Sequence, residues 1–330
     1  METQRPKYSV GILGAGSIVS SMHLPTLLAM PEMQVAWLMD IDLQKAKRVG
    51  SSFEVPAMPL PADPGNAPHA DIVLLAVPYG VREPYYEAFR QRQQALYIEK
   101  PLARTVQQHQ RYCSWFARSQ IAVGFQRRAW GAVRLLQQAL ESEAFGQLRR
   151  LSVQHGRPGQ LTGSSYSGDF RLAGGGMLFE VGIHWVDLAL FAAGAKSAHL
   201  DVGRMIRRNT FDLHTEARFT IQTGVGKAAT LDLLVSGLCQ TRNGLEFECD
   251  HATLFLSQVD GRISVEKAGV PLGIELTGRR ASYPWSPFQM CHSVWKGLVQ
   301  SLQTNSPNWT SASESLLTTQ IIEDAYGLAS

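Results

Sequence analysis

Residues 8–19 read Tyr8-Ser-Val-Gly-Ile-Leu-Gly14-Ala-Gly16-Ser-Ile-Val19, an apolar run that passes directly into a glycine turn. The apolar run predicts a buried strand, and the turn predicts the start of a helix. Gly14 permits a sharp turn, and Gly16 lets the backbone approach a phosphate with no Cβ in the way. Because the first N–H groups of a helix attract anions, this stretch predicts a phosphate-binding turn.

Asp40 strengthens that prediction, because it lies at the end of a second apolar run at 34–39. A carboxylate in this place can accept hydrogen bonds from the ribose hydroxyls of a dinucleotide. The same charge repels a 2′-phosphate, and no Arg lies within three residues of it. The pattern therefore favours NAD and leaves NADP possible. The alternative is a tight strand-to-helix connection that binds no ligand.

The remaining pattern indicates two kinds of sheet. Apolar runs at 71–77 and 95–98 are continuous, as in parallel strands covered on both faces. Beyond about residue 124 the apolar residues alternate with polar ones, which is typical of antiparallel strands with one buried face. Asp260-Gly261 predicts a two-residue hairpin turn. Helical patterns occupy 105–119, 133–143, 288–302 and 313–328.

We therefore predict an α/β protein with two domains. Residues 1–124 form a Rossmann domain with a doubly wound parallel sheet, and residues 125–330 form an α/β domain with a large, mainly antiparallel open sheet. The helix at 313–328 is expected to pack back toward the first domain.

Composition excludes several classes of function. The chain has 330 residues, with 31 Lys and Arg against 28 Asp and Glu, a net charge of +3 and no basic block. Nucleic acid is therefore not an expected partner. No signal-peptide pattern or run of about 18 apolar residues is present, which argues against secretion and membrane spanning. The four cysteines are scattered, as reduced thiols in the cytoplasm would be.

Two segments carry candidate catalytic groups. Glu99-Lys100-Pro101 follows the strand at 95–98, at the sheet edge where ligands bind in open α/β folds. The glycine-rich stretch 174–187, if helical from about residue 177, places Glu180 and His184 one turn apart on one face. The less specific alternatives are a solvated lysine and a structural core histidine. Glu180 and His184 could also bind a metal, but no third ligand joins them at a suitable spacing, so no metal is predicted.

Taken together, these motifs resemble the glucose-fructose oxidoreductase, inositol dehydrogenase and MocA family of nicotinamide-dependent oxidoreductases. The resemblance covers nearly the whole chain. The matching residues are Gly11–Gly16, His23 and Pro25, Asp40, Ala76-Val77-Pro78, Glu99-Lys100-Pro101, Gly124–Arg128, and the glycine-rich stretch ending in His184 and Asp187. The resemblance implies an enzyme that moves hydride between NAD(P) and a carbinol or ketone of a sugar, sugar nucleotide or cyclic polyol. It also implies a homo-oligomer, a dimer or tetramer, formed through the open sheet.

By this resemblance, Lys100 and His184 are the catalytic pair, and Glu180 stands where many members carry Asp. A neutral His184 could accept the hydroxyl proton, and the Lys100 ammonium could stabilise the developing alkoxide, although either could be the formal base. Arg171 and Trp185 are expected near the substrate, although a surface ion pair of Arg171 with Asp169 is equally expected. The expected cofactor-binding residues are Gly14, Ala15, Gly16, Ser17, Ile18, Asp40, Val77, Pro78, Glu99 and Gln126. The Lys100-Pro101 peptide is a candidate cis bond.

The chain also departs from the family pattern. Many members carry Asn after the proline of the 76–78 motif and His a few residues later, whereas this chain has Tyr79 and Arg82. Together with Glu180, these differences leave the substrate open. Two other functions also stay open. One is a nicotinamide-binding regulatory or scaffold protein without turnover, and the other is a reductase of a non-sugar ketone or enone.

Overall fold

The computed structural model describes residues 8–159, 169–224, 226–267, 269–275 and 286–328. By their contacts the residues form two compact units. The first contains Met1–Ala103, Gln107–Gln126 and Pro287–Glu314, and the second contains Arg104–Val106, Arg127–Ser286 and Ser315–Ser330. The predicted boundary between residues 124 and 125 lies beside the change of unit after Gln126. As a boundary between functional domains it stays a prediction.

The first unit is built on a six-stranded sheet in the order β3-β2-β1-β4-β5-β6, and every strand pair is parallel. This confirms the predicted doubly wound parallel sheet. The strands are β1 Tyr8–Leu13, β2 Met33–Asp40, β3 Ala57–Pro59, β4 Ile72–Leu75, β5 Ala95–Ile98 and β6 Ile121–Val123. All residues of β4 and β5 are buried, as strands covered on both faces require.

Helices connect and cover these strands. They are η1 Val19–His23, α1 Leu24–Leu28, α2 Leu43–Phe53, α3 Glu83–Gln91, α4 Val106–Trp115 and α8 Pro287–Thr304, with short 3₁₀ turns η2 Pro64–Asn66, η3 Tyr79–Val81 and η6 Ala312–Ser315. The 3₁₀ turn η4 Gln126–Ala129 lies at the change of unit. Helix α8 comes from the far end of the chain, and its Val294, Trp295 and Leu298 join the core formed by β1 and α1. The late helix that joins the first unit is thus α8, and α9, at the place of the helix predicted at 313–328, is part of the second unit. The packing of that helix back toward the first domain stays a prediction.

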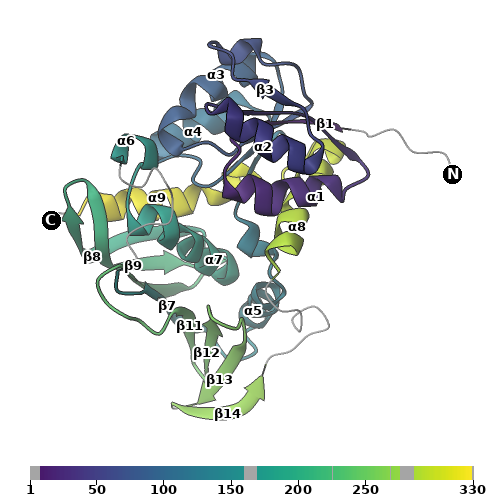
Figure 1. Ribbon diagram of the computed structural model, residues 1–330. Helices are drawn as coiled ribbons and strands as arrows, with labels where there is room; N and C mark the ends of the chain where they lie inside the picture. Colours follow the sequence, from purple (N-terminus) through teal and green to yellow (C-terminus); the bar gives the residue numbers. More distant parts are fainter. Residues whose placement is uncertain (1–7, 160–168, 225, 268, 276–285, 329–330) are drawn as a thin grey trace. The chain divides into compact units, whose positions relative to one another are not determined.

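The second unit is built on an eight-stranded sheet in the order β14-β13-β12-β11-β7-β10-β9-β8 (Figure 1). Only the β7–β10 pair is parallel among the pairs of the described strands, which confirms a mainly antiparallel sheet. The strands are β7 Leu148–Gly156, β8 Ser197–Arg208, β9 Phe211–Gln222, β10 Ala228–Ser236, β11 Gly244–Cys249, β12 Thr253–Ser257, β13 Ile263–Lys267 and β14 Val270–Glu275. The accompanying helices are α5 Gly131–Glu141, α6 Phe170–Ala173, η5 Leu178–Gly182, α7 Ile183–Ala193 and α9 Leu316–Tyr326.

The second sheet has two different faces. Leu231, Leu233 and Val235 of β10 are buried, and the residues between them are only half-buried. Helix α7 contacts β7, and α9 contacts β8. The two-residue turn predicted at Asp260-Gly261 is wrong, because β12 ends at Ser257 and β13 begins only at Ile263. Gly261 does take the positive φ expected of it, 75°, within this longer loop.

One helical stretch of the described chain, Phe170–Ala193, is long and apolar enough to cross a membrane, with a hydropathy of 1.4. However, 78% of its most apolar window is buried inside the protein, and it contains Glu180, His184 and Asp187. The burial indicates a core helix of the second unit.

Candidate functional site

The glycine turn has the geometry that phosphate binding needs. Gly14 has a φ of 101°, and a Cβ there would lie 2.3 Å from the carbonyl oxygen of Ala76, so only glycine fits. A Cβ at Gly16, in contrast, would meet nothing within 4 Å. The N–H groups of Val19 and Ser20 bond to the Gly16 carbonyl, so the helical backbone begins here. The turn therefore leaves open space in front of a helix start.

Asp40 is the last residue of β2, and its carboxylate reaches the same turn. Its Oδ2 accepts a hydrogen bond of 2.7 Å from the Ala15 N–H, and its Oδ1 accepts one of 2.9 Å from the Asp42 N–H. The sequence reasoning missed Lys45, whose ammonium lies 3.5 Å from Asp40 Oδ2. In the sequence, Lys45 lies five residues after Asp40, in the first turn of α2. A cation therefore does stand beside the Asp40 carboxylate.

The segment Glu99-Lys100-Pro101 follows β5 directly, and its Lys100-Pro101 peptide is cis, as expected. Because β5 is parallel to β4 and β4 to β1, the segment leaves the sheet at the same edge as the glycine turn. Val77 and Pro78 follow β4 at that edge as well. The first unit thus brings the predicted cofactor-binding residues and Lys100 to one edge of one sheet.

Glu99 is held by His23, which in turn bonds to Trp295, and no local spacing links these three residues. The ring Nε2 of His23 lies 2.8 Å from Glu99 Oε1, and the indole N–H of Trp295 donates to His23 Nδ1 at 3.1 Å. An indole N–H can only donate, so Nδ1 accepts and His23 presents Nε2–H to the carboxylate. Burial alone raises the pKa of Glu99, but the His23 hydrogen bond and the charges of Lys100 and Arg82 bring it below the ordinary value. Glu99 is therefore ionised at neutral pH.

Gly124 and Gln126 complete this part of the site. A Cβ at Gly124 would lie 3.0 Å from Glu99 Oε1, so glycine makes room for the carboxylate. The side-chain oxygen of Gln126 is buried and has no hydrogen-bond partner within the described residues. A buried amide oxygen of this kind is ready to accept a hydrogen bond from a ligand.

The second unit carries Glu180 and His184 on a continuous helical segment formed by η5 and α7. Nearly every side chain from Ala173 to Leu190 is buried, and Glu180, Val181 and His184 are the exceptions. Residues four apart share a helix face, so the acid and the imidazole stand on the one face that is not packed into the core.

The glycine-rich stretch before this helix allows other parts of the chain to pack closely against its backbone. A Cβ at Gly175 would lie 2.2 Å from the Tyr326 hydroxyl, and one at Gly176 would lie 2.2 Å from the Asp212 carbonyl oxygen. The buried Asp212 carboxylate accepts hydrogen bonds from the N–H groups of Gly176 at 2.7 Å and Leu178 at 2.6 Å, and from the Tyr326 hydroxyl. Asp212 thus anchors the start of the helix that carries Glu180.

Asp187 has a structural role in a buried ion pair. It forms a two-point ion pair with Arg128 at 2.8 and 2.5 Å, and both side chains are almost completely buried. Thr318 Oγ1 donates a third hydrogen bond to it at 3.0 Å. The pair fixes α7 one turn beyond His184.

Arg171 and Trp185 lie in contrasting surroundings. The Arg171 side chain is 90% exposed and lies 3.6 Å from Asp169, which is the surface ion pair expected as the alternative. Trp185 is buried, stacks on His155, and lies under the guanidinium of Arg127 with 3.9 Å from Cζ to the ring centroid. Contact of either residue with substrate stays a prediction.

Two further features of the described residues bear on ligands. They contain no group of three or more His, Cys, Asp or Glu side chains placed to hold a metal ion.

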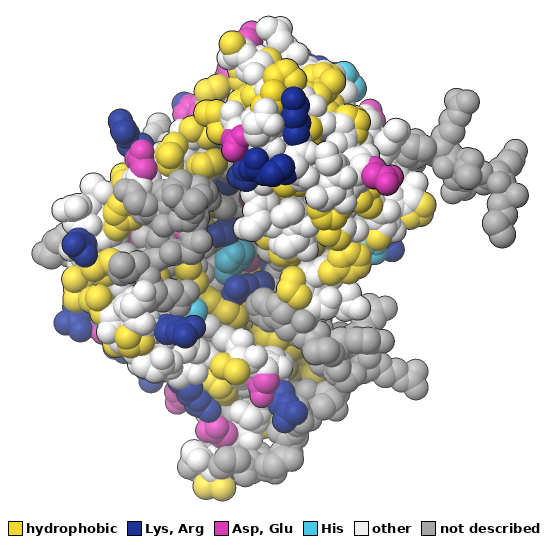
Figure 2. Space-filling view, in the orientation of Figure 1, with side chains coloured by type: hydrophobic (Ala, Val, Ile, Leu, Met, Phe, Trp, Pro, Cys, Tyr) yellow, Lys and Arg dark blue, Asp and Glu magenta, His cyan; other side chains and the backbone are white. Residues whose placement is uncertain are grey.

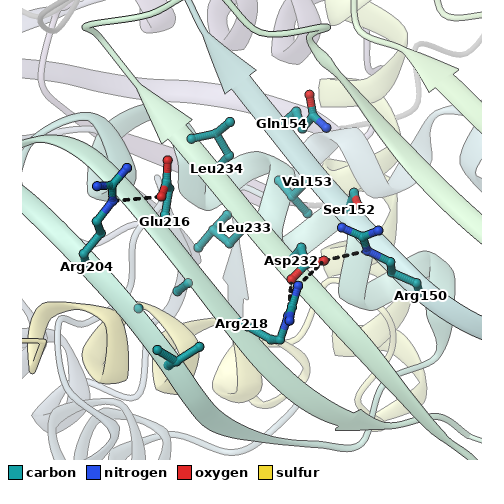
Figure 3. A pocket seen from close by; sticks show the side chains of 13 residues that line it. Arg150, Ser152, Val153, Gln154, Arg204, Glu216, Arg218, Asp232, Leu233 and Leu234 are labelled. Carbon is teal, nitrogen blue, oxygen red and sulfur yellow. Dashed lines mark hydrogen bonds and ion pairs between the residues drawn. The ribbon is translucent and has the colours of Figure 1, made fainter.

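A depression of about 520 Å³ lies over β7, β8, β9 and β10 of the second sheet (Figure 3). In it Asp232 pairs with Arg150 and Arg218, and Glu216 pairs with Arg204. None of the predicted site residues lines it. Over the face shown in Figure 2, basic and acidic side chains are scattered and form no field of one sign.

Comparison with known proteins identifies relatives of both units. The family described as "Oxidoreductase family, NAD-binding Rossmann fold" matches residues 8–125, and the "GFO/IDH/MocA C-terminal domain" matches residues 133–255. The dTDP-3,4-didehydro-2,6-dideoxy-alpha-D-glucose 3-reductase of Streptomyces antibioticus is 29% identical over 204 residues. That alignment spans 58% of this chain and 60% of the relative, less than two thirds of its length.

Solved structures share the fold. The 3-ketoreductase KijD10 from Actinomadura kijaniata, in complex with NADP and TDP-benzene, aligns with a TM-score of 0.77 at 18% identity over 97% of each chain. The WlbA dehydrogenase from Bordetella pertussis, in complex with NADH and UDP-GlcNAcA, aligns with a TM-score of 0.75 at 18% identity over 98% of this chain and 95% of its own. At this identity the likeness shows the fold alone. Because the two family matches together cover most of the sequence, the chain belongs to the glucose-fructose oxidoreductase, inositol dehydrogenase and MocA family of oxidoreductases with an NAD-binding Rossmann fold.

Proposed function

We propose that the protein is an NAD(P)-dependent oxidoreductase that moves hydride between the nicotinamide and a carbinol or ketone carbon of a sugar nucleotide. The observation that carries this proposal is the position of Lys100, at the edge of the parallel sheet that also bears the glycine turn and Asp40. The substrate class is supported by the names of the relatives, because one reduces a dTDP-sugar and two structures hold TDP-benzene or UDP-GlcNAcA.

The residues fit a nicotinamide dinucleotide. The space at Gly16 and the helix start beside it suit the pyrophosphate, and Asp40 suits the adenosine ribose. Glu99 and the unpartnered oxygen of Gln126 suit the nicotinamide ribose and carboxamide. When bound, this cofactor accepts or delivers the hydride. Asp40 favours NAD, and Lys45 beside it supplies the charge with which NADP could also be held.

Within this proposal, His184 and Lys100 handle the proton of the substrate hydroxyl. A neutral imidazole takes the proton as the carbon loses hydride, and the ammonium of Lys100 donates a hydrogen bond to the oxygen as its negative charge grows. Glu180, one turn before His184 on the same face, orients the imidazole or a substrate hydroxyl. In the direction of reduction, the same groups return the proton.

The test is kinetic, with Lys100→Ala and His184→Ala assayed on nucleotide-activated hydroxy- and ketosugars. Each substitution should lower kcat by about 10²- to 10⁴-fold, the usual contribution of general acid–base catalysis. The dissociation constant for NAD should change only a few-fold. The matched controls Lys196→Ala and His199→Ala alter exposed residues of the second unit and should leave kcat unchanged. Unchanged turnover in both site variants would refute the proposal. Tight NAD binding without turnover of any sugar would favour the scaffold function.

We also propose that the protein forms a homo-oligomer through the exposed face of the second sheet and works in the cytoplasm. On that face Val202 and Ile206 are 63% and 45% exposed. Ion pairs surround them, and their charges can align a second copy of the chain. The described cysteines are free thiols, which suits a reducing compartment. Val202→Arg combined with Ile206→Arg should lower the mass measured by sedimentation velocity to that of one chain. An unchanged mass would place the interface elsewhere.

A further inference from the structure

Arg82 lies in the first unit between the 3₁₀ turn η3 and helix α3, and its side chain is almost completely buried. Its guanidinium donates to backbone carbonyls of two loops. Nε donates to Val77 O at 2.8 Å, Nη1 donates to Pro101 O at 2.6 Å, and Nη1 also donates to Glu99 O. A buried guanidinium therefore joins the loop after β4 to the loop after β5.

The two carbonyls that Nη1 binds belong to the residues on either side of Lys100. The Glu99 carbonyl belongs to the peptide plane directly before Lys100, and the Pro101 carbonyl belongs to the second peptide plane after it. Because the backbone is held on both sides of Lys100, the direction in which the Lys100 side chain leaves it is restrained. The guanidinium is a rigid, planar fork, so it fixes both carbonyls in a single geometry. A lysine or histidine at this position has fewer donors and cannot bind all three carbonyls in the same arrangement.

Arg82 is one of the positions at which the chain departs from the family pattern, so the resemblance assigns it no role. It has a counterpart elsewhere in the same unit. Arg92, just after α3, donates from Nη1 to Ala67 O at 2.7 Å and to Gly65 O at 3.2 Å. Arg92 makes the same kind of bond, but to carbonyls at residues 65 and 67 and not to those of Glu99 and Pro101, so it provides a matched control.

We propose that Arg82 is a positioning residue for Lys100, holding the Glu99-Lys100-Pro101 backbone so that the ammonium meets the reacting oxygen. The proposal rests on the catalytic role of Lys100 proposed above. Displacement of a catalytic group by about 1 Å costs on the order of 10²-fold in rate, so the loss of this clamp is expected to appear in kcat. The charge of Arg82 also contributes to keeping Glu99 ionised.

The first experiment is a double-mutant cycle on kcat with Arg82→Gln and Lys100→Ala. Arg82→Gln alone should lower kcat by about 10- to 100-fold, with KM and the NAD dissociation constant changing only a few-fold. In the Lys100→Ala background the same substitution should have almost no effect, because the group it positions is absent. Arg92→Gln should be neutral in both backgrounds. Equal losses in both backgrounds, or no loss in either, would overturn the proposal.

The second experiment reports on Lys100 without turnover. Lysines carrying ¹³C-methyl groups are titrated by NMR in the holoprotein, and the Lys100 signal is assigned by its loss in Lys100→Arg. Removing the guanidinium charge in Arg82→Gln should raise the Lys100 titration midpoint, whereas Arg92→Gln should not. Identical midpoints in the two variants would overturn the proposal. If Lys100→Ala keeps full turnover, the proposed function fails, and this titration still decides the role of Arg82.

Arg82→Gln leaves buried carbonyls unpaired and can destabilise the fold, so Arg82→Lys is the second variant. It keeps the charge and part of the bonding, and it should retain more kcat than Arg82→Gln at equal cofactor affinity. A variant that melts below the assay temperature is measured at a lower temperature, where both forms are folded. Arg82→Lys with no better kcat than Arg82→Gln, at equal folded fraction, would contradict positioning by the cation.

Discussion

The two sheets of this protein differ in how many of their faces are covered. The parallel sheet of the first unit is covered on both faces, and every residue of β4 and β5 is buried. The sheet of the second unit has one buried face, while the other carries exposed residues such as Val202 and the ion pairs of Asp232. A sheet covered on both sides can offer ligands only the ends of its strands, whereas a half-covered sheet can offer a whole face.

The same contrast separates the two candidate catalytic segments. Lys100 lies in a loop at a strand end, and its neighbours are held through their carbonyls by Arg82. His184 lies on a helix whose start is anchored by the carboxylate of Asp212 and whose next turn is fixed by Asp187. A cation thus stabilises backbone acceptors at the strand end, and an anion stabilises backbone donors at the helix start. Each segment is fixed by a side chain whose charge is opposite to the partial charge of the backbone groups that it binds.

The strongest test of the contrast between the sheets introduces the same substitution into both. Val73→Asp buries a carboxylate in β4, where no exposed face exists, and should cost several kcal/mol, enough to prevent the first unit from folding. Val270→Asp places the same carboxylate at an exposed position of β14, the edge strand of the second sheet, and should change stability by less than about 0.5 kcal/mol. Circular dichroism shows whether each variant folds, and urea unfolding measures the loss of stability in a variant that does. Comparable losses in the two variants would contradict the contrast between the two sheets.

The sequence predicted the elements whose signals are local. The runs at 8–13 and 95–98 became β1 and β5 with the same bounds, because continuous apolar residues between turn residues suit only a doubly covered strand. The hairpin turn near Asp260 was placed too tightly, since the period-two pattern does not show where pairing stops. That α8 completes the first unit could not be predicted, because an amphipathic pattern does not say which sheet the helix will cover.

For the candidate site, the sequence motifs indicated the candidate catalytic side chains but not the residues that hold them in place. Lys100, Glu180 and His184 stand in recognisable motifs, and the predicted helical face was correct. The residues that support these segments come from other parts of the chain. Trp295 bonds across 272 positions to His23, the residue that holds Glu99, and Asp212 reaches Gly176 across 36. No local spacing encodes such contacts, and they arise only when the two units have folded.

Within the second unit, the buried and exposed sides can be compared through their ion pairs. Asp187→Ala removes the partner of a completely buried guanidinium and should destabilise the unit by about 3–5 kcal/mol. Glu143→Ala removes the partner of the partly exposed Lys227 and should cost less than about 1 kcal/mol. Chemical unfolding of both variants decides the point. A small loss for Asp187→Ala would show that water reaches Arg128 and that the core around α7 is looser than its packing indicates.

The helix layer of the first unit gives the third comparison, which depends on pH. His109 of α4 donates from Nε2 to Ala312 O at 2.9 Å, and burial lowers its pKa from 6.5 to about 4. Between pH 4 and pH 6.5 His109 is protonated in the unfolded chain but neutral in the folded chain. The free energy of unfolding is therefore highest above about pH 6.5 and falls as the pH falls toward 4.

The loss assigned to His109 reaches about 3 kcal/mol at the lower end of that range. Urea unfolding from pH 4.5 to 7 should therefore show a flatter profile for His109→Gln, which keeps a donor for the Ala312 carbonyl and cannot titrate. The exposed His199 of β8 is the matched control, and His199→Gln should leave the profile unchanged. If the profile of His109→Gln is as steep as that of the unaltered protein, the cover over the first sheet admits water at α4. The distinction between a sealed first sheet and a half-open second sheet would then hold for the strands but not for the helices around them.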